Sequence, residues 1–276
     1  MNVGVDDSTI DGRPGTFSWG DYTLAYEIRG QGPKPVVLIH GLLLPSWING
    51  EIARRLAAHG HQVILFDLLG HGRSDKPLHA SAHRLEYAGQ QVVALLDHLE
   101  LERAVVGGMS LGANVALEVA AQAPERIEGL ICEMPVLERG APGVMLTLFP
   151  LLIVLRYGGL AWRGLVSLVG RIPRTANEPL NAVLDTGGDA RAMAAVMHGY
   201  ASGPVCPTSD ERQRITAPTL VIGHAKDWIH PFNDAQALCD ELPNTTLLSA
   251  SSILELRAKP DRLMAEIIAF LDKVWV

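Results

Sequence analysis

Short apolar runs alternate along the chain with longer segments whose apolar positions recur at helical spacing. Runs rich in β-branched residues predict buried parallel strands at residues 36–40, 63–67, 104–108, 130–133 and 220–224. Helices are predicted between and after them, at residues 46–59, 82–100, 111–123, 232–242 and 260–274, with a further strand at 245–250. An antiparallel hairpin is predicted before them, at residues 16–19 and 22–28. This alternation predicts an α/β fold with about eight mostly parallel strands and helices on both faces of the sheet.

The alternation stops between residues 135 and 216, where the spacing is helical and no strand is evident. This segment follows the carboxyl end of a strand, where open α/β sheets bind ligands. We therefore predict a core formed by residues 1–134 and 217–276, with residues 135–216 inserted after the sixth strand as a helical cap. Pro150 and the glycine pair at 158 and 159 are expected to break the apolar part of the cap into short helices.

The composition narrows the class of protein. Hydrophobic residues make up 48% and charged residues 19% of 276 residues, which is enough apolar material for a sizeable core. The net charge is −7 and the sequence contains no run of basic residues, so no nucleic-acid partner is expected. The three cysteines lack metal-binding spacing, and the polar acidic start is unlike a signal peptide, so we expect a cytoplasmic protein with reduced thiols. The longest apolar stretch, residues 144–155, is too short for a transmembrane segment.

The strongest chemical signal is Gly107-Gly108-Met109-Ser110-Leu111-Gly112, between a predicted strand and a predicted helix. A serine at such a sharp turn needs small residues two positions before and two positions after it, and Gly108 and Gly112 meet this need. The turn lifts the hydroxyl above the sheet and directs a helix N-terminus toward developing negative charge. Ser110 is therefore predicted to be a catalytic nucleophile. An ordinary glycine-rich turn with a capping serine is the alternative.

Two further segments extend this signal: HGLLLPSW at residues 40–47 follows the third strand, and DLLGHGRS at residues 67–74 follows the fourth. Together with the serine turn, they resemble the α/β-hydrolase superfamily, particularly its capped single-domain esterase, lactonase and C–C hydrolase branch. The resemblance covers about residues 16–274.

The resemblance implies that the backbone N–H groups of Leu42 and Leu111 form an oxyanion hole. It implies that His40 braces the oxyanion loop, and it assigns structural roles to His71 and Arg73. The catalytic acid of the family lies in the loop after the seventh strand, and it corresponds here to Asp227, with the chain order Ser then Asp also matching.

Glu133, at the end of the sixth strand, is a weaker alternative acid, because some members of the family draw their carboxylate from that position. The family carries its catalytic histidine after the eighth strand. In this chain residues 248–260, LSASSILELRAKP, contain no histidine, and none follows His230. Since a serine hydroxyl needs an adjacent base, the triad is incomplete at its usual position.

Three histidines and one glutamate are the candidates for the role of base. His230, three residues after Asp227, is the provisional choice, followed by His224 at a strand end and His198 in the cap. Glu255 is a carboxylate alternative whose leucine neighbours predict partial burial, which would raise its pKa.

The resulting hypothesis is a serine hydrolase of a small apolar ester, thioester, lactone or related carbonyl compound, acting through a Ser110 acyl-enzyme. No nucleotide-binding loop or metal-ligand cluster is visible in the sequence, so we expect neither a cofactor nor a metal. The alternative is a non-hydrolytic homologue that binds a small molecule and has lost turnover with its histidine. Four roles are open for the apolar cap segment at residues 144–170: packing on the core, forming an apolar substrate channel, forming a homodimer interface, or contacting a membrane surface.

Overall fold

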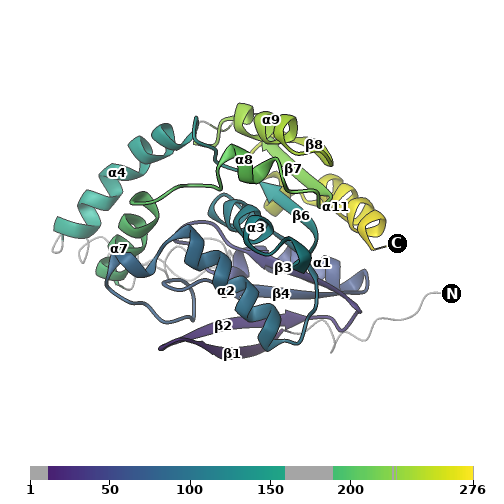
Figure 1. Cartoon of the computed structure of the whole chain (residues 1–276), viewed down its shortest axis with the longest axis horizontal. Coiled ribbons are helices and arrows are strands. Elements are labelled where there is room, and N and C mark those ends of the chain that lie inside the picture. Colours follow the sequence, from purple (N-terminus) through teal and green to yellow (C-terminus); the bar gives the residue numbers. More distant parts are fainter. Residues whose placement is uncertain (1–11, 159–188, 226, 228, 276) are drawn as a thin grey trace.

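The computed structural model describes residues 12–158, 189–225, 227 and 229–275. Its centre is an eight-stranded sheet with the order β1-β2-β4-β3-β5-β6-β7-β8 (Figure 1). Strands β1 and β2 form an antiparallel hairpin, β2 pairs antiparallel with β4, and all other neighbours are parallel. The strands are β1 (Arg13–Trp19), β2 (Tyr22–Arg29), β3 (Lys34–Ile39), β4 (His61–Asp67), β5 (Ala104–Met109), β6 (Ile127–Glu133), β7 (Thr219–His224) and β8 (Thr245–Ala250). The predicted fold class is confirmed.

Helices cover both faces of this sheet because successive strand residues point to opposite sides. In β3, Val37 and Ile39 pack against one helical layer, whereas Val36 and Leu38 pack against the other. The first layer contains α2 (Leu85–His98), α3 (Leu111–Gln122) and α9 (Phe232–Glu241), and the second contains α1 (Gly50–Ala58), α10 (Glu255–Ala258) and α11 (Asp261–Val274).

Two helix starts differ from the prediction. The segment from residue 46 begins as a 3-10 turn, η2 (Ser46–Asn49), and α1 starts only at Gly50. The Ser46 N–H donates to the buried Asp67 carboxylate at 2.7 Å, and this contact with β4 fixes the turn. The helix predicted from residue 82 follows the turn η3 (Ala80–Ala82) and begins at Leu85.

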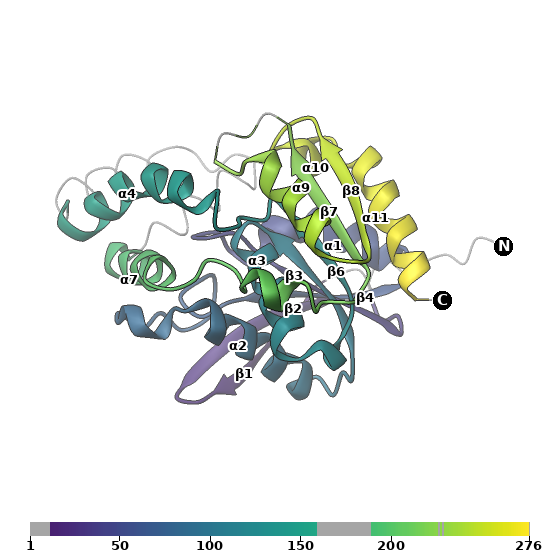
Figure 2. The ribbon, with the colours of Figure 1, turned by 45° about the horizontal axis from the view of Figure 1, so that its top comes forward.

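Between β6 and β7 the described residues form α4 (Ala141–Tyr157), α7 (Ala190–Ala201) and α8 (Ser209–Arg212). Helices α4 and α7 lie side by side at the end of the molecule far from α11 (Figure 2). Leu155 packs with Ala194 and Met197 between them. None of the described helices is long and apolar enough to cross a membrane. The cap boundaries at 135 and 216 stay a prediction.

The expectation that Pro150 ends a helix is wrong, because α4 continues through it to Tyr157. Proline removes one backbone hydrogen bond, but Pro150 lies on the exposed side of α4, where its ring disturbs no packing. Helix α4 ends before Gly158, as predicted. Gly159 and most of the second half of the apolar cap segment lie outside the described residues.

Polar contacts from the core hold both ends of the segment that carries α4 and α7. The Asn114 amide of α3 donates to the carbonyl of Val136 at 2.7 Å and to that of Val205 at 2.6 Å. Arg212 of α8 is 1% exposed and pairs with Glu138 at 2.8 Å and with Glu241 of α9 at 2.6 Å. Val136 and Glu138 lie just after β6. The Asn114 and Arg212 side chains therefore fix the position of α4 and α7 above the sheet.

Replacing Arg212 with methionine is expected to lower the free energy of unfolding by about 3 kcal/mol, because two carboxylates lose their buried cation. A Tm about 8 °C lower is the corresponding thermal shift. The matched control is Arg54→Met, which removes an exposed ion pair with Glu51 and is expected to cost less than about 1 kcal/mol. Urea and thermal denaturation of both variants measure the difference, and equal effects would contradict the role given to Arg212.

Candidate active site

Ser110 lies at a sharp turn between β5 and α3. Its φ of 53° and ψ of −114° are unusual for a residue with a side chain. A Cβ atom on Gly108 would come within 2.9 Å of the Gly112 backbone, and one on Gly112 would come within 2.8 Å of the His40 carbonyl oxygen. Both glycines are therefore required for this turn. The Ser110 N–H donates to the carbonyl of Glu133 at 2.8 Å, which ties the turn to the end of β6.

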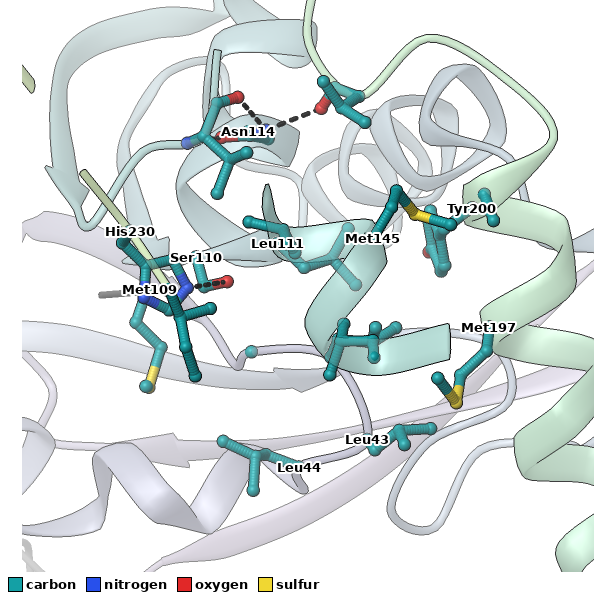
Figure 3. A pocket seen from close by; sticks show the side chains of 18 of the residues that line it. Leu43, Leu44, Met109, Ser110, Leu111, Asn114, Met145, Met197, Tyr200 and His230 are labelled. Carbon is teal, nitrogen blue, oxygen red and sulfur yellow. Dashed lines mark hydrogen bonds between the residues drawn. The ribbon is translucent and has the colours of Figure 1, made fainter. Parts of the chain in front are cut away.

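The Ser110 hydroxyl faces His230 (Figure 3), with 2.9 Å between its oxygen and His230 Nε2. On the other side of the ring, Nδ1 lies 2.7 Å from the Asp227 carboxylate oxygen Oδ2. A carboxylate only accepts hydrogen bonds, so Nδ1 carries the proton and Nε2 is free to accept from the serine hydroxyl. The structure thus brings Ser110, His230 and Asp227 into one hydrogen-bonded chain.

A tight turn explains how a histidine only three residues from the aspartate reaches the serine. The second Asp227 oxygen, Oδ1, accepts the backbone N–H groups of Ile229 at 2.8 Å and His230 at 3.0 Å. This Asx-type turn folds the chain back, and His230 then meets the other oxygen of the same carboxylate. The Asp227 side chain is 2% exposed, so its charge is shielded from water by the turn that it forms.

The other proposed histidines are placed elsewhere. His224 is buried at the end of β7, with a ring nitrogen 3.3 Å from the Glu133 carboxylate. His198 is on the exposed side of α7. Of the three candidates, His230 is the one whose described contacts include Ser110.

Glu255 does not have the environment predicted for it. Hydrogen bonds from the hydroxyl and the backbone of Ser251, with further help from Arg262, lower the pKa of Glu255 to about 2. The side chain is largely buried, with 9% of it exposed, but the predicted upward shift is wrong, because its polar partners move the pKa down. A carboxylate with so low a pKa is a poor proton acceptor at neutral pH.

An ion pair occupies the region where the family histidine was expected. Arg257 of α10 donates to both carboxylate oxygens of Glu133, to Asn49 Oδ1 at 3.0 Å and to the Met109 sulfur at 3.1 Å. Burial would raise the pKa of Glu133, but the charge of Arg257 and hydrogen bonds from His224 and Arg257 outweigh it and hold the pKa below its usual value. Glu133, the alternative catalytic acid, therefore forms an ion pair with Arg257.

Sequence reasoning missed this pair. The available signal was a single arginine, three residues before Pro260, in the segment where a histidine was sought. The Arg257–Glu133 pair stabilises the turn that carries Ser110, because Arg257 contacts Met109, the residue before Ser110, and the Glu133 carbonyl accepts the Ser110 N–H.

Leu42 and Leu111 both lie beside Ser110 on the wall of one cavity. Leu111 is the first residue of α3, so its N–H has no acceptor within the helix. His40 is fully buried next to the loop that carries Leu42, with Nδ1 2.8 Å from the Gly41 carbonyl and Nε2 accepting the Leu68 N–H at 3.1 Å. Burial lowers the pKa of His40, which therefore stays neutral and holds the loop through one donated and one accepted hydrogen bond.

His71 and Arg73 contact backbone and structural groups, in keeping with the roles given to them. His71 Nδ1 lies 3.2 Å from the Leu69 carbonyl, and its ring packs on that of His40 with centroids 4.5 Å apart. Arg73 donates to the Tyr26 carbonyl at 3.2 Å.

Four buried histidines predict acid-sensitive stability. Burial lowers the pKa of each of them below the ordinary 6.5: His40, His61, His71 and His83. The unfolded chain takes up protons near pH 6.5 and the folded chain does not, so stability is complete above that pH and falls below it. Each ring contributes about 1.4 kcal/mol per pH unit until its folded pKa is passed. Urea denaturation between about pH 8 and about pH 5 measures the slope, which His83→Gln should reduce; an unchanged slope in that variant would contradict the role given to burial.

Ser110 and His230 open onto a cavity of about 250 Å³ between the oxyanion loop, α4 and α7 (Figure 3). Its wall is mostly leucine, valine and methionine. Asn114 also lies on the wall, but its amide is engaged by Val136 and Val205. The arrangement places Ser110 and the His230 ring on the wall of an apolar space that Leu42 and Leu111 also line.

Comparison with known proteins agrees with this fold. A family model described as the alpha/beta hydrolase fold matches residues 34–160. The chain is similar to 3-oxoadipate enol-lactonase 2 of Acinetobacter baylyi, with 28% identity over 251 residues that cover 86% of this chain and 89% of that one. The chain has the fold of the α/β-hydrolase superfamily. The crystal structure of an enol-lactonase from Burkholderia xenovorans LB400 superposes on it with a TM-score of 0.76 at 21% identity, covering 94% of this chain and 100% of that chain.

A shorter match has higher identity. The dihydrolipoyllysine-residue acetyltransferase component of an acetoin cleaving system from Pseudomonas putida is 41% identical over 107 residues, which are 38% of this α/β-hydrolase and 28% of that protein. The match therefore spans about a quarter of the longer relative. Lactone hydrolysis is the activity in the name of the relative from Acinetobacter baylyi that matches over nearly its full length.

Proposed function

We propose that this α/β-hydrolase cleaves a small apolar ester, thioester, lactone or related carbonyl compound through a Ser110 acyl-enzyme. The observation that carries the proposal is the hydrogen-bonded chain from Ser110 through His230 to Asp227. A serine alone is a weak nucleophile. In these hydrogen bonds His230 supplies the adjacent base and Asp227 orients its ring.

In the first step His230 Nε2 accepts the hydroxyl proton while the Ser110 oxygen attacks the substrate carbonyl carbon. The negative charge on the carbonyl oxygen is stabilised by the N–H groups of Leu42 and Leu111. His230 then gives its proton to the leaving oxygen or sulfur, and the acyl-enzyme forms. Water, deprotonated by the same imidazole, attacks the acyl carbon, and the returning proton releases Ser110 and the acid product.

Two observations favour turnover over the alternative of a binding protein without activity. The glycines around Ser110 tolerate a strained turn that binding alone does not require. The cavity is also lined by Ser110 and His230, so a bound substrate would lie next to both side chains. Two of the similar proteins are named as enol-lactonases, and a lactone is within the proposed substrate class.

The test is covalent labelling with a fluorophosphonate, followed by peptide mapping and a screen of p-nitrophenyl and thioester substrates. We expect the label on Ser110 and ester turnover that is lost in Ser110→Ala. Ser251→Ala is the matched control, since Ser251 is an exposed serine outside the cavity lining. Full activity in Ser110→Ala, or labelling of another residue alone, would show that the proposed function is wrong.

A further inference from the structure

The wall of the cavity is built jointly by core and cap. The core contributes the three leucines of the oxyanion loop, Leu42, Leu43 and Leu44, together with Met109 and Leu111. Helix α4 contributes five apolar side chains and α7 contributes Met197 and Tyr200; those of α4 are Val144, Met145, Leu148, Phe149 and Leu152. Figure 3 shows Met145 and Met197 on the cap side, opposite Leu43 and Leu44. A methionine wall adapts to flexible apolar chains.

Most of the polar side chains on this wall already have hydrogen-bond partners. Ser110 and His230 bond to each other, and Asn114 uses its amide to hold the two ends of the cap segment. Burial raises the pKa of Tyr200, so its hydroxyl stays uncharged. Within the part of the chain that the structure describes, no Asp, Glu, Lys or Arg lines the cavity.

Charged side chains gather instead in a second cavity of about 520 Å³. Leu43, which has a positive φ of 60°, lines both cavities and forms a partition between them. The charged residues on the far side of this partition are Glu27, Asp67, Arg73, Lys76 and Asp189. Arg73 and Lys76 thus line the second cavity and not the one next to Ser110.

We propose that the acyl part of the substrate is an uncharged hydrocarbon chain bound in the α4–α7 cavity, and that acyl groups ending in a carboxylate are rejected. This inference rests on the proposed function. Each methylene that enters the apolar wall is expected to raise kcat/KM about fourfold. A terminal carboxylate would lose its hydration without gaining a cation, which is a large penalty in an apolar site.

The experiment compares p-nitrophenyl acetate, butyrate and hexanoate with the mono-p-nitrophenyl ester of adipic acid, which has the same six-carbon acyl chain with a terminal carboxylate. The methyl ester of the adipate compound separates size from charge. We expect kcat/KM to rise about 250-fold from acetate to hexanoate, because the acyl chain gains four methylenes. Hexanoate and the methyl-capped compound should both exceed the free adipate by about a thousandfold.

A matched pair of variants on α4 tests the location. Leu148 lines the cavity, whereas Leu146 on the same helix is 78% exposed. Leu148→Arg should shift the adipate-to-hexanoate ratio of kcat/KM at least about tenfold toward adipate, because the guanidinium pairs with the carboxylate. Leu146→Arg should leave the ratio unchanged. The native ratio still tests the charge preference if Leu148→Arg does not fold.

The outcomes separate this inference from the proposed function. Ser110-dependent turnover with equal rates for hexanoate and free adipate would overturn the hydrocarbon preference and leave the serine hydrolase intact. An unchanged ratio in a folded Leu148→Arg variant would overturn the location. Absence of both labelling and turnover with every ester would instead contradict the proposed function itself.

Discussion

Replacement of His230 by glutamine is expected to lower kcat about a millionfold, with little change in KM. Glutamine is similar in size, but its amide does not take up a proton at neutral pH, so the Ser110 hydroxyl loses its base. The 2.9 Å contact between His230 and Ser110 is the described contact that supplies an imidazole to the serine. Steady-state kinetics with the best ester from the screen measures the loss.

His198→Gln is the control for this experiment, because His198 is exposed on α7 and should retain full activity. The His230 variant is also expected to keep its Tm within a few degrees, since the ring is replaced at the edge of a cavity. If His230→Gln keeps a substantial fraction of native kcat, another group activates the serine and the assignment of the base is wrong.

Replacing Asp227 by asparagine is expected to lower kcat about ten-thousandfold. If the asparagine amide nitrogen faces His230 Nδ1, it donates to that atom, and the ring proton moves to Nε2, where it blocks acceptance from Ser110. If the amide is turned the other way, its nitrogen opposes the backbone N–H groups of Ile229 and His230 and breaks the turn. Either orientation removes the base from its working state.

Glu133→Gln distinguishes the two candidate acids. It weakens the Arg257 pair and should lower the Tm, but we expect kcat to stay within about tenfold of native, because Asp227 still orients His230. A larger loss of kcat in Glu133→Gln than in Asp227→Asn would reverse the assignment of the acid. Kinetics and thermal denaturation of both variants decide between the two.

Much of the fold follows from local patterns in the chain. The buried strands carry continuous β-branched runs because helices cover both faces, and the glycines at 108 and 112 are dictated by backbone contacts that no side chain would fit. Boundaries were less predictable: η2 depends on the Asp67 carboxylate of a distant strand, and Pro150 is tolerated because of the side of α4 on which it lies.

The site was only partly predictable for a similar reason. The choice of His230 over His224 and His198 depends on the turn that Asp227 forms with its own Oδ1, which spacing alone does not reveal. The segment after β8 has its own partner, since Arg257 reaches Glu133 across the sheet edge. The pKa direction of Glu255 was misjudged because its leucine neighbours indicate only burial, whereas the hydrogen bonds from Ser251 and Arg262 that lower the pKa are not evident from the sequence.

Chemical rescue tests the identity of the base most directly. In His230→Ala, fluorophosphonate labelling of Ser110 should nearly cease and should return as imidazole is added, because free imidazole can enter the vacated space and accept the serine proton. The same imidazole concentrations should leave the labelling of Ser110→Ala at zero and that of the native protein unchanged. Native-like labelling of His230→Ala without imidazole would contradict the account, because Ser110 would then be activated without His230.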